Sequence, residues 1–125
     1  MSSWSFAGIG FELLDDDDGT SPDWLRDPIF DARHLLGTGT TEYNLLGYTP
    51  WTLEAVALLL PDPADPTYDP TDAYDALRGH GGLTGTLINP NGQSFTAILV
   101  SNKIRPIVSG VVGYTGAVVF VRPTA

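Results

Sequence analysis

The sequence predicts a mainly β protein: a closed or split β-barrel or sandwich with one short helix, formed as a single domain over residues 1–125. Three observations predict this fold class. Short segments of alternating apolar and polar residues recur along the chain, turns rich in glycine and proline separate them, and only one segment has a helical pattern. With 125 residues, of which 42% are hydrophobic, the chain can bury one modest core.

The N-terminal part of the chain predicts three strands. The alternation that begins at Trp4 changes parity after Gly8, which indicates a β-bulge within one N-terminal strand. A glycine turn at residues 37–39 is expected to join two more strands, one over residues 29–36 and one over residues 42–46.

The segment WTLEAVALLL, residues 51–60, is open to two interpretations. Its leucine and alanine content allows a helix. Pro50 precedes it and Pro61 ends it, which favours a strand, buried on both faces at its far end. The segment that follows, PDPADPTYDP, predicts a stiff, extended loop, because prolines fix φ and remove backbone donors.

One short helix of about two turns is expected after this loop. Thr71 stands where an N-cap belongs, Asp72 and Asp75 lie in the first turn against the positive helix end, and Gly79 is the expected C′ glycine. An NPNG turn predicts a hairpin in the remaining chain. The four strands expected there cover residues 83–88, 94–100, 103–108 and 112–121.

The segment RGHGGLTGTL carries four glycines beside the helix, a composition found in phosphate-binding loops. Such a loop needs the order strand, glycines, helix, so that the helix N-terminus faces the phosphate. Here the glycines follow the helix, whose C-terminal end carries a partial negative charge, and no GKS or GKT accompanies them. Helix capping and close backbone packing explain these glycines better than a nucleotide site does.

The net charge of -9 is unevenly distributed. All 15 acidic residues lie at or before Asp75, a part of the chain that contains only two basic residues, Arg26 and Arg33. Binding to duplex nucleic acid in its usual electrostatic form is therefore not expected. The asymmetry has two interpretations: opposite faces or the two sides of a contact between identical copies, or simply two acidic loops.

The sequence lacks cysteine, which excludes disulfides, thiolate nucleophiles and cysteine-ligated zinc. No signal peptide is expected from MSSWSFAGIG, which has no basic residue and no long apolar run. No apolar run approaches the roughly 20 residues of a membrane helix, so no membrane insertion is expected.

No catalytic, cofactor-binding or metal-binding residues are predicted, and the protein is not expected to be an enzyme. DDDDG does not fit a calcium loop, since Thr20 and Arg26 occupy the sixth and twelfth positions counted from Asp15. A solvated acidic loop is the default, with adventitious cation binding as the alternative. His34 and His80 form no zinc motif, and no GxSxG nucleophile elbow is present. A hydrolase that uses a pair of acids is the weakest alternative.

The two acidic loops and one tryptophan are the predicted interface. Trp4 and Trp51 lie on expected strands and are interpreted as core, whereas Trp24 lies in a loop and is interpreted as an exposed anchor. The candidate interface residues are Asp15, Asp16, Asp17, Asp18, Trp24, Asp62, Asp65, Tyr68 and Asp69.

Several segments together resemble one family. They are WSFAGIGFELL, HLLGTGTTEYNLLGYTPWTLEAVALL, DAYDALRGHGGLTGTLINPNGQSFTAILV and YTGAVVFVRP. Their layout is similar to the small tail proteins of long-tailed bacteriophages, the tail-tube-like and distal-tail-like (minor tail, tail tip) ring subunits. The resemblance covers most of the chain from Trp51 onward.

This resemblance implies a structural subunit of a phage tail that works by assembly. The expected partners are copies of the chain in a ring and neighbouring tail proteins, with DNA only as passing cargo that is not specifically bound. The expected location is the virion tail, assembled in the host cytoplasm. If the acidic side lined a tube, it would repel that DNA. The alternative function is a carbohydrate- or protein-binding module of a virion tip, acting through Trp24.

Overall fold

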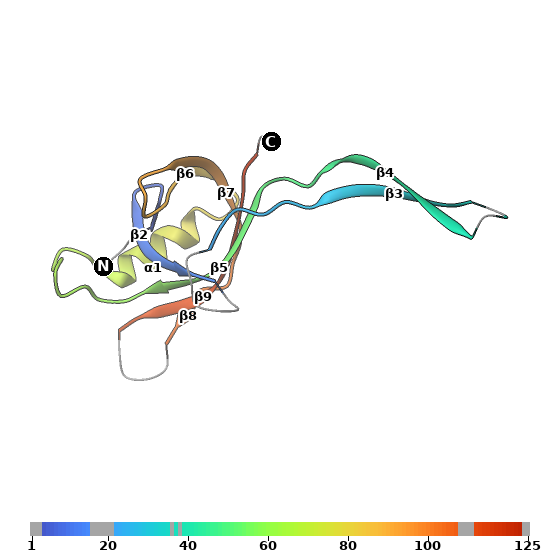
Figure 1. The fold of residues 1–125 in the computed structure, drawn as a ribbon. Helices are drawn as coiled ribbons and strands as arrows, with labels where there is room; N and C mark the ends of the chain where they lie inside the picture. The colour runs from blue at the N-terminus through green and yellow to red at the C-terminus, as the bar shows by residue number, and fades with distance from the viewer. Residues whose placement is uncertain (1–3, 16–21, 36, 38, 108–111, 124–125) are drawn as a thin grey trace.

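The computed structural model describes residues 4–15, 22–35, 37, 39–107 and 112–123. It confirms the predicted fold class: 54% of these described residues lie in strands, and within them one helix is present and six strands close into a barrel (Figure 1). The elements in chain order are β1 (Trp4–Phe6), β2 (Ile9–Leu14), β3 (Pro28–Leu35), β4 (Thr40–Tyr48), β5 (Thr52–Leu59), α1 (Pro70–Gly79), β6 (Thr84–Ile88), β7 (Ser94–Asn102), β8 (Arg105–Pro106) and β9 (Tyr114–Val121).

The barrel is antiparallel throughout, with the strand order β5-β2-β1-β6-β7-β9. It closes because β9 also pairs with β5 along the whole of both strands. The short β8 pairs with the start of β9, where β7 has already ended. Alternate residues of each strand point inward and form one apolar core. Its buried members are Trp4, Phe6, Phe11, Leu13, Leu53, Ala55, Ala57, Leu59, Ala73, Leu77, Leu87, Ala97, Leu99, Ile104, Val118 and Phe120.

Strand β5 confirms the strand interpretation of residues 51–60, with one correction. Its inward side chains are buried, but Val56 and Leu58 on the other face are only partly buried. The strand is therefore not buried on both faces at its far end. A barrel wall has only one side facing the core, so the outward apolar residues stay accessible.

The N-terminal segment forms two strands, and the prediction of one bulged strand was wrong. Phe6 pairs with Ile9, so the chain reverses within the two residues between them. Ala7 and Gly8 both have positive φ, 53° and 81°. Positive φ at both central residues defines a type I′ turn, whose twist matches the flanking strands. The change of parity after Gly8 marks this reversal.

Helix α1 begins two residues earlier than predicted. Asp69, and not Thr71, is the N-cap, and its Oδ1 accepts a hydrogen bond of 2.9 Å from the backbone N–H of Thr71. Pro70 can therefore take the first helical position, where a missing N–H is tolerated. The helix packs against β2, β5 and β9 and adds Ala73 and Leu77 to the core.

The glycines after α1 serve in turn formation and close packing, as expected, but the residue that ends the helix differs from the predicted one. Gly79 belongs to the helix and His80 is the C-cap, so the prediction of Gly79 as the C′ glycine was wrong. The left-handed conformation is at Gly82, with φ of 80°. Gly85 confirms close packing, because a Cβ there would lie 2.9 Å from the ring of Phe6.

The C-terminal hairpin forms at the predicted turn. Asn89 N–H donates to the carbonyl oxygen of Gln93 at 3.0 Å, and Gly92 has φ of 82°. Of the strand expected over residues 103–108, β8 covers Arg105–Pro106 among the described residues, and residue 108 lies outside them. The preceding residues cross the interior side of β9, where Ile104 is buried.

Strands β3 and β4 form a separate two-stranded sheet. Figure 1 shows them as a long hairpin that projects from the barrel. The glycine turn expected at residues 37–39 lies at its tip, where Gly37 and Gly39 have positive φ of 82° and 67°; Thr38 lies outside the described residues. The sequence predicted both strands, but the barrel contains neither.

Candidate assembly surfaces

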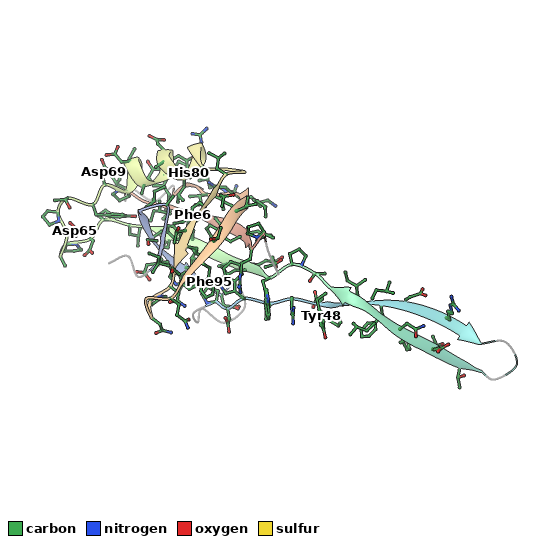
Figure 2. All side chains as sticks on the ribbon, turned by 90° about the horizontal axis from the view of Figure 1, so that it is seen from above. Phe6, Tyr48, Asp65, Asp69, His80 and Phe95 are labelled. Carbon is green, nitrogen blue, oxygen red and sulfur yellow. The ribbon has the colours of Figure 1, made fainter. Side chains whose placement is uncertain are left out.

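The root of the β3–β4 hairpin is held to the barrel. Leu25 and Thr52 exchange two backbone hydrogen bonds of 2.8 Å, which tie the segment before β3 to the start of β5. The guanidinium of Arg26 lies 4.1 Å from the ring centroid of Tyr48 and 4.5 Å from that of Trp51. Figure 2 shows Tyr48 at this root. These contacts fix the direction in which the hairpin leaves the barrel.

The projecting part of the hairpin has one apolar face. Phe30 is opposite Leu45 in the ladder, and Ala32 is opposite Tyr43. Directly opposed residues share a face, and so do residues two apart on one strand. The rings of Phe30 and Tyr43 are in edge-to-face contact, with centroids 6.3 Å apart.

The other face of the hairpin is polar. Asp31 is opposite Asn44, and Arg33 is opposite Glu42. Arg33 Nε lies 3.9 Å from Asp31 Oδ2, a weak surface ion pair. The hairpin is therefore amphipathic, although the rest of the described chain covers neither face (Figure 2).

The apolar face is open to solvent. The exposed fractions are 52% for Phe30, 65% for Tyr43 and 51% for Leu45. Leu46, the extra residue where the register shifts, is 68% exposed. A contiguous exposed apolar patch on a protein surface marks an interaction site. A two-stranded hairpin alone in water is marginally stable at best, so this one is expected to be stabilised by a partner.

The barrel offers a second partly exposed apolar surface. Its outward side chains on β5 and β9 include Val56, Leu58 and Val119, each only partly buried. Val121 is opposite Ile98 of the next strand, and both are also partly buried. The hairpin face and this barrel wall are different surfaces of one chain.

The acidic loop before α1 lies at the end of the molecule away from the hairpin, where Figure 2 labels Asp65 and Asp69. The prediction that this loop is extended was wrong. Asp62 accepts a hydrogen bond of 2.9 Å from the N–H of Ala64, and Asp65 accepts one of 3.1 Å from the N–H of Thr67. Aspartate side chains that bond to the backbone two residues on form tight turns. The candidate interface residues of this loop are thus largely engaged in shaping it.

Tyr68 anchors the same loop to the barrel. Its hydroxyl donates a hydrogen bond of 2.8 Å to the carbonyl oxygen of Gly10 on β2. Burial, together with the negative charges of Glu12 and Asp69, raises the pKa of Tyr68 to about 12 from its ordinary value of 10.0. Tyr68 is therefore a structural anchor rather than an exposed contact residue.

The raised pKa predicts a loss of stability at alkaline pH. The unfolded chain releases the Tyr68 proton near pH 10, whereas the folded chain keeps it to about pH 12. The stability that the hydroxyl contributes is present below pH 10 and is lost as the pH rises through about 12. Tyr68→Phe is expected to lower the free energy of unfolding by about 1 kcal/mol near neutral pH, through the lost hydrogen bond. Urea unfolding of both proteins across this range should show the gap closing above pH 10, and a constant gap would contradict the assignment.

The first acidic loop is described only in part. Asp15 is partly buried directly after β2, and Asp16, Asp17 and Asp18 lie outside the described residues. Among the residues that are described, no three histidine or acidic side chains gather closely enough to hold a metal ion. The one helix in the described ranges is too short and too polar to cross a membrane.

Trp24 is half-buried, not the freely exposed anchor that was expected. Its ring packs against Phe95 of β7, with centroids 5.5 Å apart. Its indole N–H is buried and has no hydrogen-bond acceptor in the part of the chain that the structure describes. Trp4 is in the core, as predicted, but Trp51 is only partly buried and lies against Arg26.

Comparison with known proteins finds no matching family model and no matching curated sequence.

Proposed function

We propose that this protein is a structural subunit of a bacteriophage tail, of the tail-tip, distal-tail or tube-like ring type, and that it acts through oligomeric assembly. The observation that carries the proposal is the β3–β4 hairpin, which projects from the barrel and exposes Phe30, Tyr43 and Leu45 on one face. In a monomer, such a hairpin in water would contribute little or no stability to the fold.

Identical copies are the partners that the surfaces favour. The hairpin and the apolar wall of β5 and β9 are two different surfaces on the same chain. Contact between two different surfaces of identical subunits is heterologous, and it closes into a ring when the rotation permits. With eight residues in β3 at about 3.3 Å each, the hairpin reaches about 26 Å, enough to cover much of a neighbouring small barrel.

The charge distribution supports a tail component through which DNA passes without being bound. The net charge is -9, and the acidic loop with Asp65 and Asp69 is a surface feature. An acidic surface repels phosphate and does not retain it. The proposed location is therefore the tail of the virion, next to other tail proteins.

Electron microscopy tests this function. Purified protein is expected to form rings of uniform diameter, and a labelled antibody against the chain is expected to mark the tail of particles that carry it. Label restricted to the capsid, or particles without the protein, would contradict the tail assignment. Irregular aggregates in place of rings would contradict ring assembly.

A further inference from the structure

A pocket of about 500 Å³ opens at the barrel surface beside the β6–β7 turn, near Phe95 (Figure 2). This volume is in the range of sites for small molecules. Its lining combines aromatic side chains, Trp4, Trp24 and Phe95, with polar ones. The pocket is separate from the apolar face of the hairpin, so what it binds does not depend on the proposed assembly.

The aromatic wall is fixed from outside the pocket. The guanidinium of Arg122 lies 5.1 Å from the ring centroid of Phe95 and 5.7 Å from that of Trp24. Arg122 is not among the residues that line the pocket. It lies over one face of each ring, and the remaining ring surface is open to apolar contact.

The polar side of the pocket is built by the NPNG turn. Asn89 Oδ1 accepts hydrogen bonds from the backbone N–H groups of Asn91 and Gln93, at 3.1 and 2.9 Å. Asn89 Nδ2 donates to Gln93 Oε1 at 2.9 Å, which positions the Gln93 amide. Within the described residues, Gln93 Nε2 and the Asn91 side chain have no protein partner, so both can bind a ligand.

The charges around the pocket disfavour strongly charged ligands. Among the described residues of the lining, Asp23 is the one ionisable side chain, and its carboxylate disfavours an anion. Arg122, behind the rings of Trp24 and Phe95, disfavours a cation. A neutral ligand with one apolar face and several hydroxyl groups fits both conditions. The geometry points to a neutral saccharide: the C–H face of a pyranose ring packs on Trp24 or Phe95, and its hydroxyls bond to Asn91, Gln93 and Asp23.

Saturation-transfer NMR on the full-length protein tests this site, because it observes the ligand and works at any assembly size. The probes are the methyl glycosides of glucose, galactose and N-acetylglucosamine, each at about 10 mM, a concentration suited to millimolar dissociation constants. Transfer to at least one of them is expected, with the strongest signals from ring C–H protons. Tryptophan fluorescence titration then gives the affinity.

Variants of the lining assign the binding to the pocket. Trp24→Ala is expected to weaken binding by about tenfold or more, equivalent to about 1.4 kcal/mol. Gln93→Ala, in an exposed turn where folding is not at risk, is expected to weaken it about threefold to tenfold. Asn44→Ala removes an equally exposed amide from the hairpin and should leave the affinity unchanged. The proposal is overturned if no glycoside receives transfer, or if binding survives both pocket substitutions. Preferential binding of methyl glucuronide over methyl glucoside would overturn the requirement for a neutral ligand.

Discussion

Replacement of both Phe30 and Tyr43 by serine is expected to abolish assembly and leave the barrel folded. The two rings contact each other and are the largest side chains of the exposed hairpin face. Truncation of a central aromatic residue in an interface typically costs about 2 kcal/mol or more. The pair is therefore expected to lose about 3 kcal/mol, roughly two orders of magnitude in the association constant, allowing for their mutual contact.

The stability of the barrel is expected to be unchanged, because neither ring belongs to its core. Sedimentation velocity measures the assembly, and thermal unfolding of the same samples shows that the barrel is intact. Arg33→Ser combined with Glu42→Ser is the matched control. It alters an opposed pair on the polar face of the same hairpin and leaves the net charge unchanged. Equal loss of assembly in both double variants would show that the apolar face is not the contact.

Gly116→Ala is expected to destabilise the barrel by about 3 kcal/mol, the upper part of the usual range for overpacking. A Cβ at this position would collide with the backbone of Lys103 and Ile104, first with the carbonyl oxygen and carbon of Lys103 and then with the Ile104 Cα. Backbone atoms cannot move aside as the end of a side chain can. Lys103 is further held by a hydrogen bond of 2.8 Å from its N–H to the carbonyl oxygen of Ala117.

Gly79→Ala is the matched control for this substitution. Gly79 lies at the end of α1, without a positive φ, and a Cβ added there would meet no atom within 4 Å. Alanine there is expected to be neutral or stabilising by up to about 1 kcal/mol. In thermal unfolding, Gly116→Ala should lower Tm by roughly 10 °C. A Tm within about 2 °C of the wild-type value would contradict the close packing of the Lys103–Ile104 backbone against β9.

The barrel strands could be predicted because each carries its own alternation. Strand β5 shows this best: Leu53, Ala55 and Ala57 alternate with less buried residues, and the prolines at 50 and 61 bracket the strand. The N-terminal turn was missed because Ala7 adopts a positive φ, which a glycine usually signals. The helix start was misplaced because the residues before and after Pro70, Asp69 and Thr71, are both suitable N-caps. The observed N-cap is Asp69, since this places Pro70 at the first helical position, which proline favours.

The projecting hairpin could not be separated from the barrel by sequence. Residues Phe30, Ala32, Tyr43 and Leu45 show the same alternation as a core strand, since a face buried by a partner carries the same pattern as a face buried by the chain itself. The pocket could not be predicted from the sequence either. The sequence singles out Trp24, but Gln93 and Phe95 are distant from it along the chain and come close to it only in the folded barrel.

Native mass spectrometry of the purified wild-type chain counts the subunits in each assembly, so it shows whether the chain assembles. One discrete multiple of 13.4 kDa is expected at micromolar concentration for the wild-type chain, and the monomer is expected for the variant with Phe30→Ser and Tyr43→Ser. A wild-type chain that stays at 13.4 kDa at every concentration, like the variant, would contradict assembly through the hairpin.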